Sequence, residues 1–377
     1  MAVRNSRLDS LRGIASLCVV FHHAFHEMNT SLVQRVLDPP LSGVATGDVP
    51  GRLLMSIASG GMAVNLFFIL SGAVLIASLQ REPLFNLAAV IRFAGRRILR
   101  IYPAMIATVL AFGVISLVTL PARQAAPFTL RQVLENCLLI TSSVNGGTWT
   151  LQSEMLMVPV ILFVAWCRSF IGNIALIAFL FWAATCLLTG APFASIWLAV
   201  ALPSFALGML IPTAIQPNDV QRLPGWTFLA GLAAMVAIRF YFPLSSMPAL
   251  IAILAISFLV VASLYHGKEE SHLLDHPALK FLGKISYGLY LIHPIVGATL
   301  FPFYESAIGA ERVANHYAVF GLIFAVIIAG IAIPISAYCE RYLEQPFIRL
   351  GQRLFARRPR APIELPAASQ AVPTPAE

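Results

Sequence analysis

Long apolar runs recur along this chain and constrain its fold more than any other feature. A helix that crosses a bilayer needs about 20 mainly apolar residues. We place ten such runs at residues 12–28, 60–79, 101–120, 152–167, 170–189, 193–212, 225–242, 248–266, 285–304 and 316–339. The fourth run is short, which is typical of a tilted or partly re-entrant helix. Because only helices and closed barrels satisfy their backbone in lipid, the runs predict an all-α, polytopic bundle of about ten transmembrane helices.

The composition favours a protein embedded in a lipid bilayer over a soluble one. Residues of the AVILMFWYC set make up 58% of the chain and charged residues 11%, against roughly 25% charged residues in soluble proteins. The net charge is +8, but the basic residues are mostly arginines in the gaps between the runs, so we expect no nucleic-acid partner. The five cysteines are far apart, which favours apolar packing over disulfides or metal ligands, and we expect no metal.

The distribution of basic residues predicts the orientation, because cytoplasmic loops carry an excess of Lys and Arg. With the N-terminus in the cytoplasm, 19 of the 25 Lys and Arg residues fall on the cytoplasmic side, and six, among them Arg52 and Arg239, fall outside. Both termini are therefore predicted to be cytoplasmic. The segment after Arg360 is rich in Pro and Ala, so we expect a transmembrane domain over residues 1–350 and a disordered cytoplasmic tail over 351–377.

Ionisable residues inside the first run are functional hypotheses, because charges are costly in a bilayer. Arg12 stands at its inner edge, and His22, His23 and His26 follow. Arg12 and His23 are eleven residues apart, so in a helix they share one face and lie about 16 Å apart along the axis. Arg12 cannot reach His23; it either serves a long molecule that enters from the cytoplasm or marks the membrane edge. For the histidines, hydrogen bonding within the bundle is the alternative to a functional role.

Polar residues in and beside the next runs also have two interpretations each. Arg97 and Arg100 precede the third run, where they either mark the cytoplasmic side or bind an anionic ligand. Ser71 interrupts the second run. Glu154, which we place at the outer mouth of the fourth run, could accept a proton or hold a sugar hydroxyl. Its alternative is an interaction with the helix macrodipole.

In the ninth run, Tyr290 and His293 are three residues apart and so share a helix face. The alternative for His293 is a local kink at Pro294, with the freed carbonyl satisfied nearby. Intramembrane histidines in a ten-span bundle would also suit a secondary transporter, although no internal repeat is visible in the sequence.

Together these motifs resemble those of the acyltransferase 3 family of membrane acyltransferases. They follow the family's order over nearly the whole chain: RLDSLRGIASLCVVFHH (7–23), FFILSG (67–72), RRILRIYP (96–103), GTWTLQSE (147–154), GKISYGLYLIHP (283–294) and YLEQP (342–346). One such motif is weakly specific, whereas six in order are highly specific. The family's motif of Arg, ten residues and His falls on Arg12 and His23, and its RxxR motif falls on Arg97 and Arg100.

The resemblance implies transfer of an acyl group, usually acetyl, from cytosolic acyl-CoA to a hydroxyl group, in the bacterial inner membrane. The acceptor would be an exported or cell-surface carbohydrate or glycolipid. Many relatives append an SGNH domain, for which this chain has no room, so it resembles the stand-alone members. Those members modify exopolysaccharides, O-antigens, lipo-oligosaccharides or, as an alternative acceptor class, small molecules such as macrolides.

The resemblance and the chemistry of the residues together lead to hypotheses for the roles of single residues. The three arginines would bind the acyl-CoA phosphates. His23 would act as general base or as nucleophile, and Glu154 would be a second catalytic residue. Ser71, Tyr290 and His293 would bind the substrate, with Ser71 or Tyr290 donating to the developing oxyanion.

Overall fold

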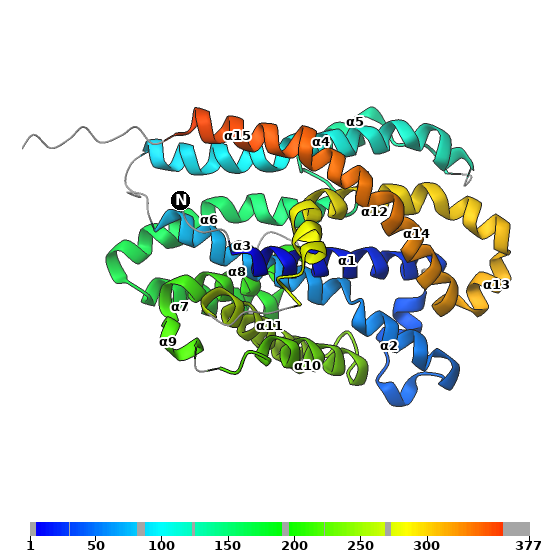
Figure 1. Ribbon diagram of the computed structural model, residues 1–377, viewed down its shortest axis with the longest axis horizontal. Coiled ribbons are helices and arrows are strands. Elements are labelled where there is room, and N and C mark those ends of the chain that lie inside the picture. The colour runs from blue at the N-terminus through cyan, green and yellow to red at the C-terminus, as the bar shows by residue number, and fades with distance from the viewer. Residues whose placement is uncertain are drawn as a thin grey trace, which may run out of the picture.

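The computed structural model describes residues 5–29, 31–80, 87–122, 125–190, 196–221, 223–267 and 273–356. Every regular element in these ranges is a helix, which confirms the all-α prediction. The ten predicted runs fall on α1 (Ser6–Met28), α3 (Gly60–Leu79), α4 (Leu87–Ala122), α6 (Thr148–Ile171), α7 (Ile174–Thr189), α8 (Ile196–Ala214), α10 (Thr227–Tyr241), α11 (Met247–His266), α12 (Pro277–Ile308) and α14 (Tyr317–Cys339) (Figure 1).

Shorter helices connect or follow these elements. They are η1 (Val33–Leu37), η2 (Leu41–Gly43), η3 (Thr46–Asp48), α2 (Val49–Ile57), α5 (Leu130–Cys137), α9 (Pro217–Val220), α13 (Ala310–Asn315), η4 (Glu340–Glu344) and α15 (Gln345–Leu354). Helix α15 thus continues past the predicted domain end at residue 350. Residues 357–377 of the predicted tail lie outside the described residues.

Within the described ranges, six helical segments are long and apolar enough to cross a membrane. They are Thr46–Leu79, Leu87–Pro121, Thr148–Ile171, Met247–His266, Pro277–Ile308 and Tyr317–Leu354. Helices α7, α8 and α10 are apolar but shorter. Helix α1 is not among the six, because its arginines and histidines lower its hydropathy. The number of ten spans and the cytoplasmic position of both termini therefore stay predictions.

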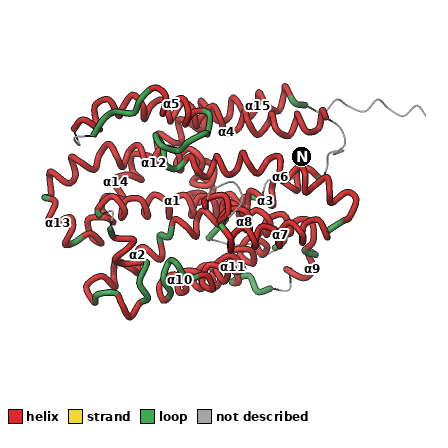
Figure 2. The backbone as a smooth tube through the Cα atoms, turned by 180° about the vertical axis from the view of Figure 1, so that it is seen from behind, coloured by secondary structure: helices red, strands yellow, loops and turns green. Residues whose placement is uncertain are grey.

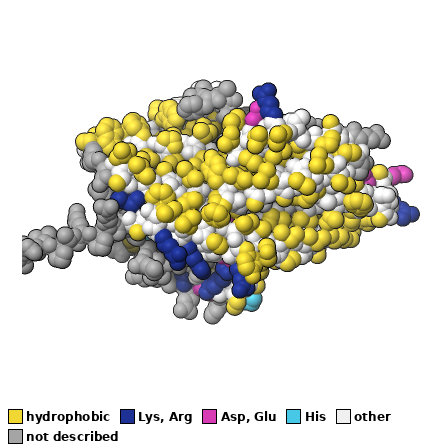
Figure 3. Space-filling view, turned by 90° about the horizontal axis from the view of Figure 1, so that it is seen from above, with side chains coloured by type: hydrophobic (Ala, Val, Ile, Leu, Met, Phe, Trp, Pro, Cys, Tyr) yellow, Lys and Arg dark blue, Asp and Glu magenta, His cyan; other side chains and the backbone are white. Residues whose placement is uncertain are grey.

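The long helices lie side by side along the long axis of the molecule, with α1 inside the bundle (Figure 1). Helix α1 packs against α12, α14 and α3, while α8 packs against both α3 and α7. The start of α1, α9 and α15 lie toward one end of the bundle, and α2 and α13 toward the other, as the view from behind also shows (Figure 2). Much of the face in Figure 3 is apolar, with Lys and Arg gathered in a few places, as contact with lipid requires.

The packing of α1 against α12 has a constant register. The two helices approach closely at Gly13 and Gly283, where a Cβ on Gly13 would lie 2.6 Å from the Gly283 nitrogen. Ten residues further along each helix, His23 contacts His293. Both contacts join residues 270 positions apart, so the two helices run parallel, and the glycine contact fixes which residues face each other.

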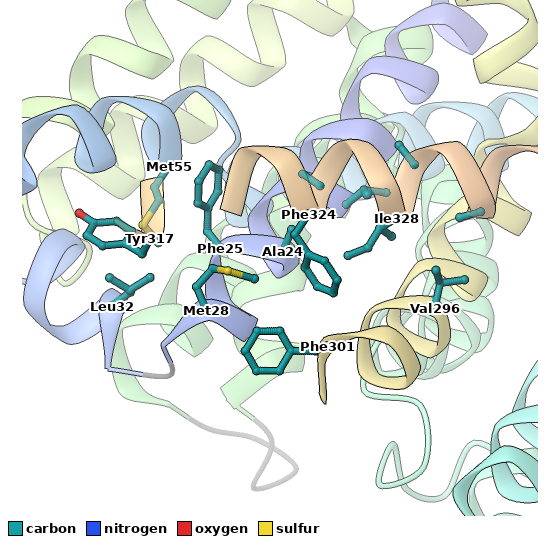
Figure 4. Packing of buried hydrophobic residues seen from close by; sticks show 14 of the residues in the cluster. Ala24, Phe25, Met28, Leu32, Met55, Val296, Phe301, Tyr317, Phe324 and Ile328 are labelled. Atoms are coloured by element: carbon teal, nitrogen blue, oxygen red, sulfur yellow. The ribbon is translucent and has the colours of Figure 1, made fainter. Parts of the chain in front are cut away.

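An apolar cluster further along α1 and α12, beyond the contact of His23 with His293, also holds these helices together. Figure 4 shows Phe25 and Met28 of α1 packed beside Phe301 of α12 and beside Phe324 and Ile328 of α14. All five side chains are buried. Because an aromatic side chain contributes a large apolar area, this cluster holds the second half of α1 firmly in the bundle, and with it the histidines.

The segment between α4 and α6 folds back into the bundle. Asn136 of α5 receives hydrogen bonds from the amides of Val144 and Asn145, at 3.1 and 2.9 Å. The Asn145 side chain donates to the Leu291 carbonyl at 3.0 Å, near the middle of the 32-residue α12. Helix α6 therefore begins deep inside the bundle; at 24 residues it is longer than the fourth run, and its tilted or partly re-entrant character stays a prediction.

Candidate active site

A pair of histidines joins α1 to α12. His293 Nδ1 lies 2.9 Å from the Leu289 carbonyl, and His293 Nε2 lies 2.9 Å from His23 Nδ1. A carbonyl only accepts hydrogen bonds, so His293 Nδ1 carries a hydrogen. Neutral His293 then accepts at Nε2 from the N–H at His23 Nδ1. This assignment leaves His23 Nε2 with its lone pair.

Pro294 follows His293 and frees a carbonyl in the same turn of α12. Proline has no N–H, so the Tyr290 carbonyl lacks its helical donor. His293 Nδ1 bonds to the Leu289 carbonyl, one residue before that carbonyl. The two sequence interpretations of His293, a local kink at Pro294 and a functional side chain, therefore both stay predictions.

The histidine pair (His23 and His293) is lined by aromatic and hydroxyl groups. His293 is 1% exposed. The Tyr290 ring meets the His293 ring edge-on, with 5.9 Å between centroids, as their shared helix face predicts. The Tyr290 and Thr150 hydroxyls hydrogen-bond at 3.1 Å, and Phe67 packs edge-on against Tyr290 at 6.0 Å. Tyr290, which contacts the pair, is thus itself contacted from α3 and α6.

A second polar centre joins α3, α4 and α6. Arg97 of α4 is buried and forms an ion pair with Glu154 of α6. The Ser71 hydroxyl donates to the same carboxylate oxygen at 2.7 Å. The expectation that Glu154 stands at the outer mouth of its helix is wrong, because the inward fold of residues 138–147 brings this carboxylate to Arg97. The Ser71 hydroxyl is likewise engaged by Glu154.

The three arginines predicted to bind the acyl donor lie together. The charge of Arg97 interacts with those of Arg12 and Arg100. Arg100 is exposed, Arg12 is half-buried and Arg97 is buried. Arg12 also forms an ion pair with Asp9, at 3.6 Å. Within this arginine group (Arg12, Arg97 and Arg100), Arg100 is thus the exposed member, while Arg97 is paired with Glu154 and Arg12 with Asp9.

Sequence reasoning missed several residues beside the arginine group. Glu344 of η4 is buried and lies within electrostatic range of the Arg100 guanidinium and the Tyr287 hydroxyl. The Tyr287 hydroxyl donates to the Ile101 carbonyl at 2.6 Å. Glu340 is also buried and pairs with Lys284 at 3.0 Å. Two acids four residues apart at the end of an apolar run were the available signal, since such charges are costly near lipid.

The two centres are neighbours along the bundle axis. Along α1, Arg12 and His23 are about 16 Å apart. Along α6, Thr150 at the histidine pair and Glu154 at the arginine group are one turn apart, or about 6 Å. Glu154, Thr150 and Tyr290 thus follow one another from the arginine group to the histidine pair, and we call these three side chains the polar path. Within the described residues, no group of three or more His, Cys, Asp or Glu side chains is placed to hold a metal ion.

Comparison with known proteins identifies one family. The acyltransferase domain that defines the acyltransferase 3 family matches residues 5–339 of the 377. The matched range contains the histidine pair, the arginine group, Ser71, Glu154 and Tyr290. No curated protein and no solved structure matches the chain.

Proposed function

The chain belongs to the acyltransferase 3 family of membrane acyltransferases, and from this premise we propose that it is an acyl-CoA-dependent O-acyltransferase. It would move an acyl group, most simply acetyl, from cytosolic acyl-CoA to a hydroxyl of an exported or cell-surface carbohydrate. The observation that carries the proposal is the hydrogen bond between His23 and His293, because it leaves a lone pair on His23 Nε2 beside a polar path from the arginine group.

The arginine group supports the choice of donor. Coenzyme A is anionic, and guanidinium groups bind phosphate with paired, charge-assisted hydrogen bonds. Arg100 would make the first of these contacts because it is exposed, with Arg97 and Arg12, each paired with one carboxylate, beside it. With the phosphates there, the flexible pantetheine arm would carry the thioester along the polar path, over the roughly 16 Å that separates Arg12 from His23 along α1.

The histidine pair supports the reaction. His23 Nε2 would take the proton of the acceptor hydroxyl while the hydroxyl oxygen attacks the thioester carbonyl. The carbon–sulfur bond then breaks, and the CoA thiolate takes the proton from His23. In the covalent variant, Nε2 first attacks the carbonyl, and the carbon–sulfur bond breaks with release of the CoA thiolate. The acceptor oxygen then attacks the acyl carbon, the bond from that carbon to Nε2 breaks, and the freed Nε2 takes the hydroxyl proton and passes it to the thiolate. In both variants His293 holds the His23 ring by accepting its Nδ1 hydrogen.

Stabilisation of the oxyanion falls to Tyr290 in this proposal. Both Ser71 and Tyr290 are hydroxyl donors predicted for this role, but the Ser71 hydrogen is directed to Glu154. The Tyr290 hydroxyl lies beside the histidine pair and contacts the Thr150 hydroxyl. A hydroxyl so placed can donate to the charge that develops on the carbonyl oxygen.

The test compares His23→Ala with His26→Ala, a matched change on the same helix at an exposed residue. Membranes with equal amounts of protein are incubated with labelled acetyl-CoA, and labelled carbohydrate and free CoA are measured. His23→Ala should lower transfer by 100-fold or more, in the range found for general bases, while His26→Ala should transfer normally. Full activity of His23→Ala would refute the proposed role. Label retained on the wild-type protein without acceptor would identify the covalent variant.

A further inference from the structure

A second group of basic side chains includes one from α2, a helix at the end of the bundle opposite α15 (Figure 1). This basic cluster consists of His22 of α1, Arg52 of α2 and Arg239 of α10. The charge of Arg239 interacts with both Arg52 and His22. The cluster is separate from the arginine group, and the proposed reaction uses none of its members.

Arg52 is a structural residue. It is fully buried, and its guanidinium donates to backbone carbonyls at distances of 2.6 to 3.1 Å. The acceptors are the carbonyls of Val36, Pro39, Phe240 and Phe242. These bonds join the segment after α1 to the end of α10. Arg52 therefore needs no ligand, but its fixed charge adds to the positive potential at Arg239.

Arg239 has the opposite character. It is 5% exposed, and its Nε and Nη1 have no hydrogen-bond partner among the residues that the structure describes. His22 Nδ1 is also buried and has no hydrogen-bond partner among the described residues. Asp48, which precedes α2, is already paired with Arg35 at 3.1 Å. A buried guanidinium without a counter-charge is strongly unfavourable, so an anion is the ligand that this arrangement favours.

The start of α3 adds a third element. His22 lies against Gly60, the first residue of α3, where a Cβ would come within 2.7 Å of His22 Cδ2. The N-terminus of the 20-residue α3 is therefore beside His22; its Met62 amide is capped by the Ser59 side chain, so the helix contributes mainly the positive end of its dipole. Helix N-termini favour anions partly for this reason. Arg239, whose charge acts on His22, and His22 itself add side-chain nitrogens that have no hydrogen-bond partner among the described residues.

We propose that Arg239, His22 and the N-terminus of α3 bind an oxoanion of the acceptor, which makes the acceptor an acidic carbohydrate bearing a carboxylate or a phosphate. This inference rests on the proposed function. His22 directly precedes His23, and their ring centroids are 5.9 Å apart. An oxoanion on His22 and Arg239 would therefore hold a neighbouring hydroxyl within reach of His23 Nε2. Donor and acceptor charges would then be bound by separate basic groups on opposite sides of the histidine pair.

The test measures binding to the full-length protein in phosphatidylcholine nanodiscs by calorimetry. D-glucuronate and D-glucose 6-phosphate serve as acidic probes and D-glucose as the neutral one. At least one acidic probe should bind the wild type ten-fold or more tightly than D-glucose. Arg239→Gln should remove this preference, Arg239→Lys should keep part of it, and Arg131→Gln, an exposed arginine of α5, should leave it unchanged. Equal binding of acidic and neutral probes to the wild type would overturn the inference.

Two controls separate this inference from its premise. Binding of acetyl-CoA is measured in the same samples: unchanged affinity in Arg239→Gln shows that the variant is folded, and no binding to the wild type would overturn the donor site alone. The second control repeats the measurement in nanodiscs that contain phosphatidylglycerol. If this anionic lipid abolishes the preference for the acidic probes, the oxoanion belongs to a lipid headgroup, and the assignment to the acceptor is wrong.

Discussion

Replacement of Gly13 by alanine tests whether the contact between α1 and α12 sets the geometry of the histidine pair. The added Cβ would lie 2.6 Å from the Gly283 nitrogen and 2.8 Å from the Leu282 carbonyl carbon. Both are backbone atoms, so no side chain can rotate away. Only a shift of one helix relative to the other would relieve the contact.

The size of the shift follows from these distances. Carbon atoms in contact are about 3.5 Å or more apart, so the helices must separate by about 1 Å. If α1 moves as a rigid body, the 2.9 Å hydrogen bond between His23 and His293 opens to about 3.9 Å, beyond hydrogen-bonding distance. A misplacement of about 1 Å lowers catalysis about 100-fold, while overpacking costs about 1–3 kcal/mol of stability.

The assay is CoA release from acetyl-CoA by membranes that contain equal amounts of each variant. The matched control is Gly330→Ala on α14, where a Cβ would have no atom within 4 Å. We expect Gly13→Ala to lose about 100-fold in rate and Gly330→Ala to match the wild type. Wild-type activity of Gly13→Ala would show that the register of α1 and α12 does not control the histidine pair.

Two further variants probe the arginine group. Glu154→Gln leaves the buried Arg97 without its counter-charge and should lower the unfolding free energy by about 3–5 kcal/mol, read as a lower melting temperature in detergent; Glu135→Gln, in an exposed pair, should cost under about 1 kcal/mol. Equal melting temperatures for the two would contradict the assignment of Arg97 and Glu154 as a buried pair. Arg100→Ala should raise KM for acetyl-CoA with little change in kcat. The ratio of the variant's KM to the wild-type KM should be smaller at high salt, because Arg100 is exposed and salt screens its charge. An unchanged KM would limit this arginine to setting the topology.

The sequence predicted the helices well because each apolar run specifies its own secondary structure. His23 and His293 were each recognised as candidates, but their contact was not. It depends on which residues of α1 and α12 face each other, and local periodicity says nothing about that register. The close approach of Gly13 and Gly283 supplies it, and one glycine in each of two distant runs does not reveal such a contact.

Glu154 shows a different limit of sequence reasoning. Its position near the start of an apolar run indicates a helix end at the membrane surface. The structure places that helix end inside the bundle, because Asn136 and Asn145 replace water as hydrogen-bonding partners of the inward segment. Two asparagines in a polar connection are typical of an ordinary surface loop. Their role becomes visible only with the Leu291 carbonyl beside them.

The buried polar groups of this chain form two classes: those whose hydrogen bonds are made within the protein and those whose hydrogen bonds are not. Arg52 is as buried and as charged as any residue here, and the rule that intramembrane charges are functional would select it. Yet its contacts with four carbonyls make it part of the scaffold. Arg239 directly precedes Phe240, whose carbonyl accepts a hydrogen bond from Arg52. Yet Arg239 has no such contacts at Nε or Nη1 among the described residues. Burial without satisfaction, rather than burial alone, is therefore the property that points to a ligand.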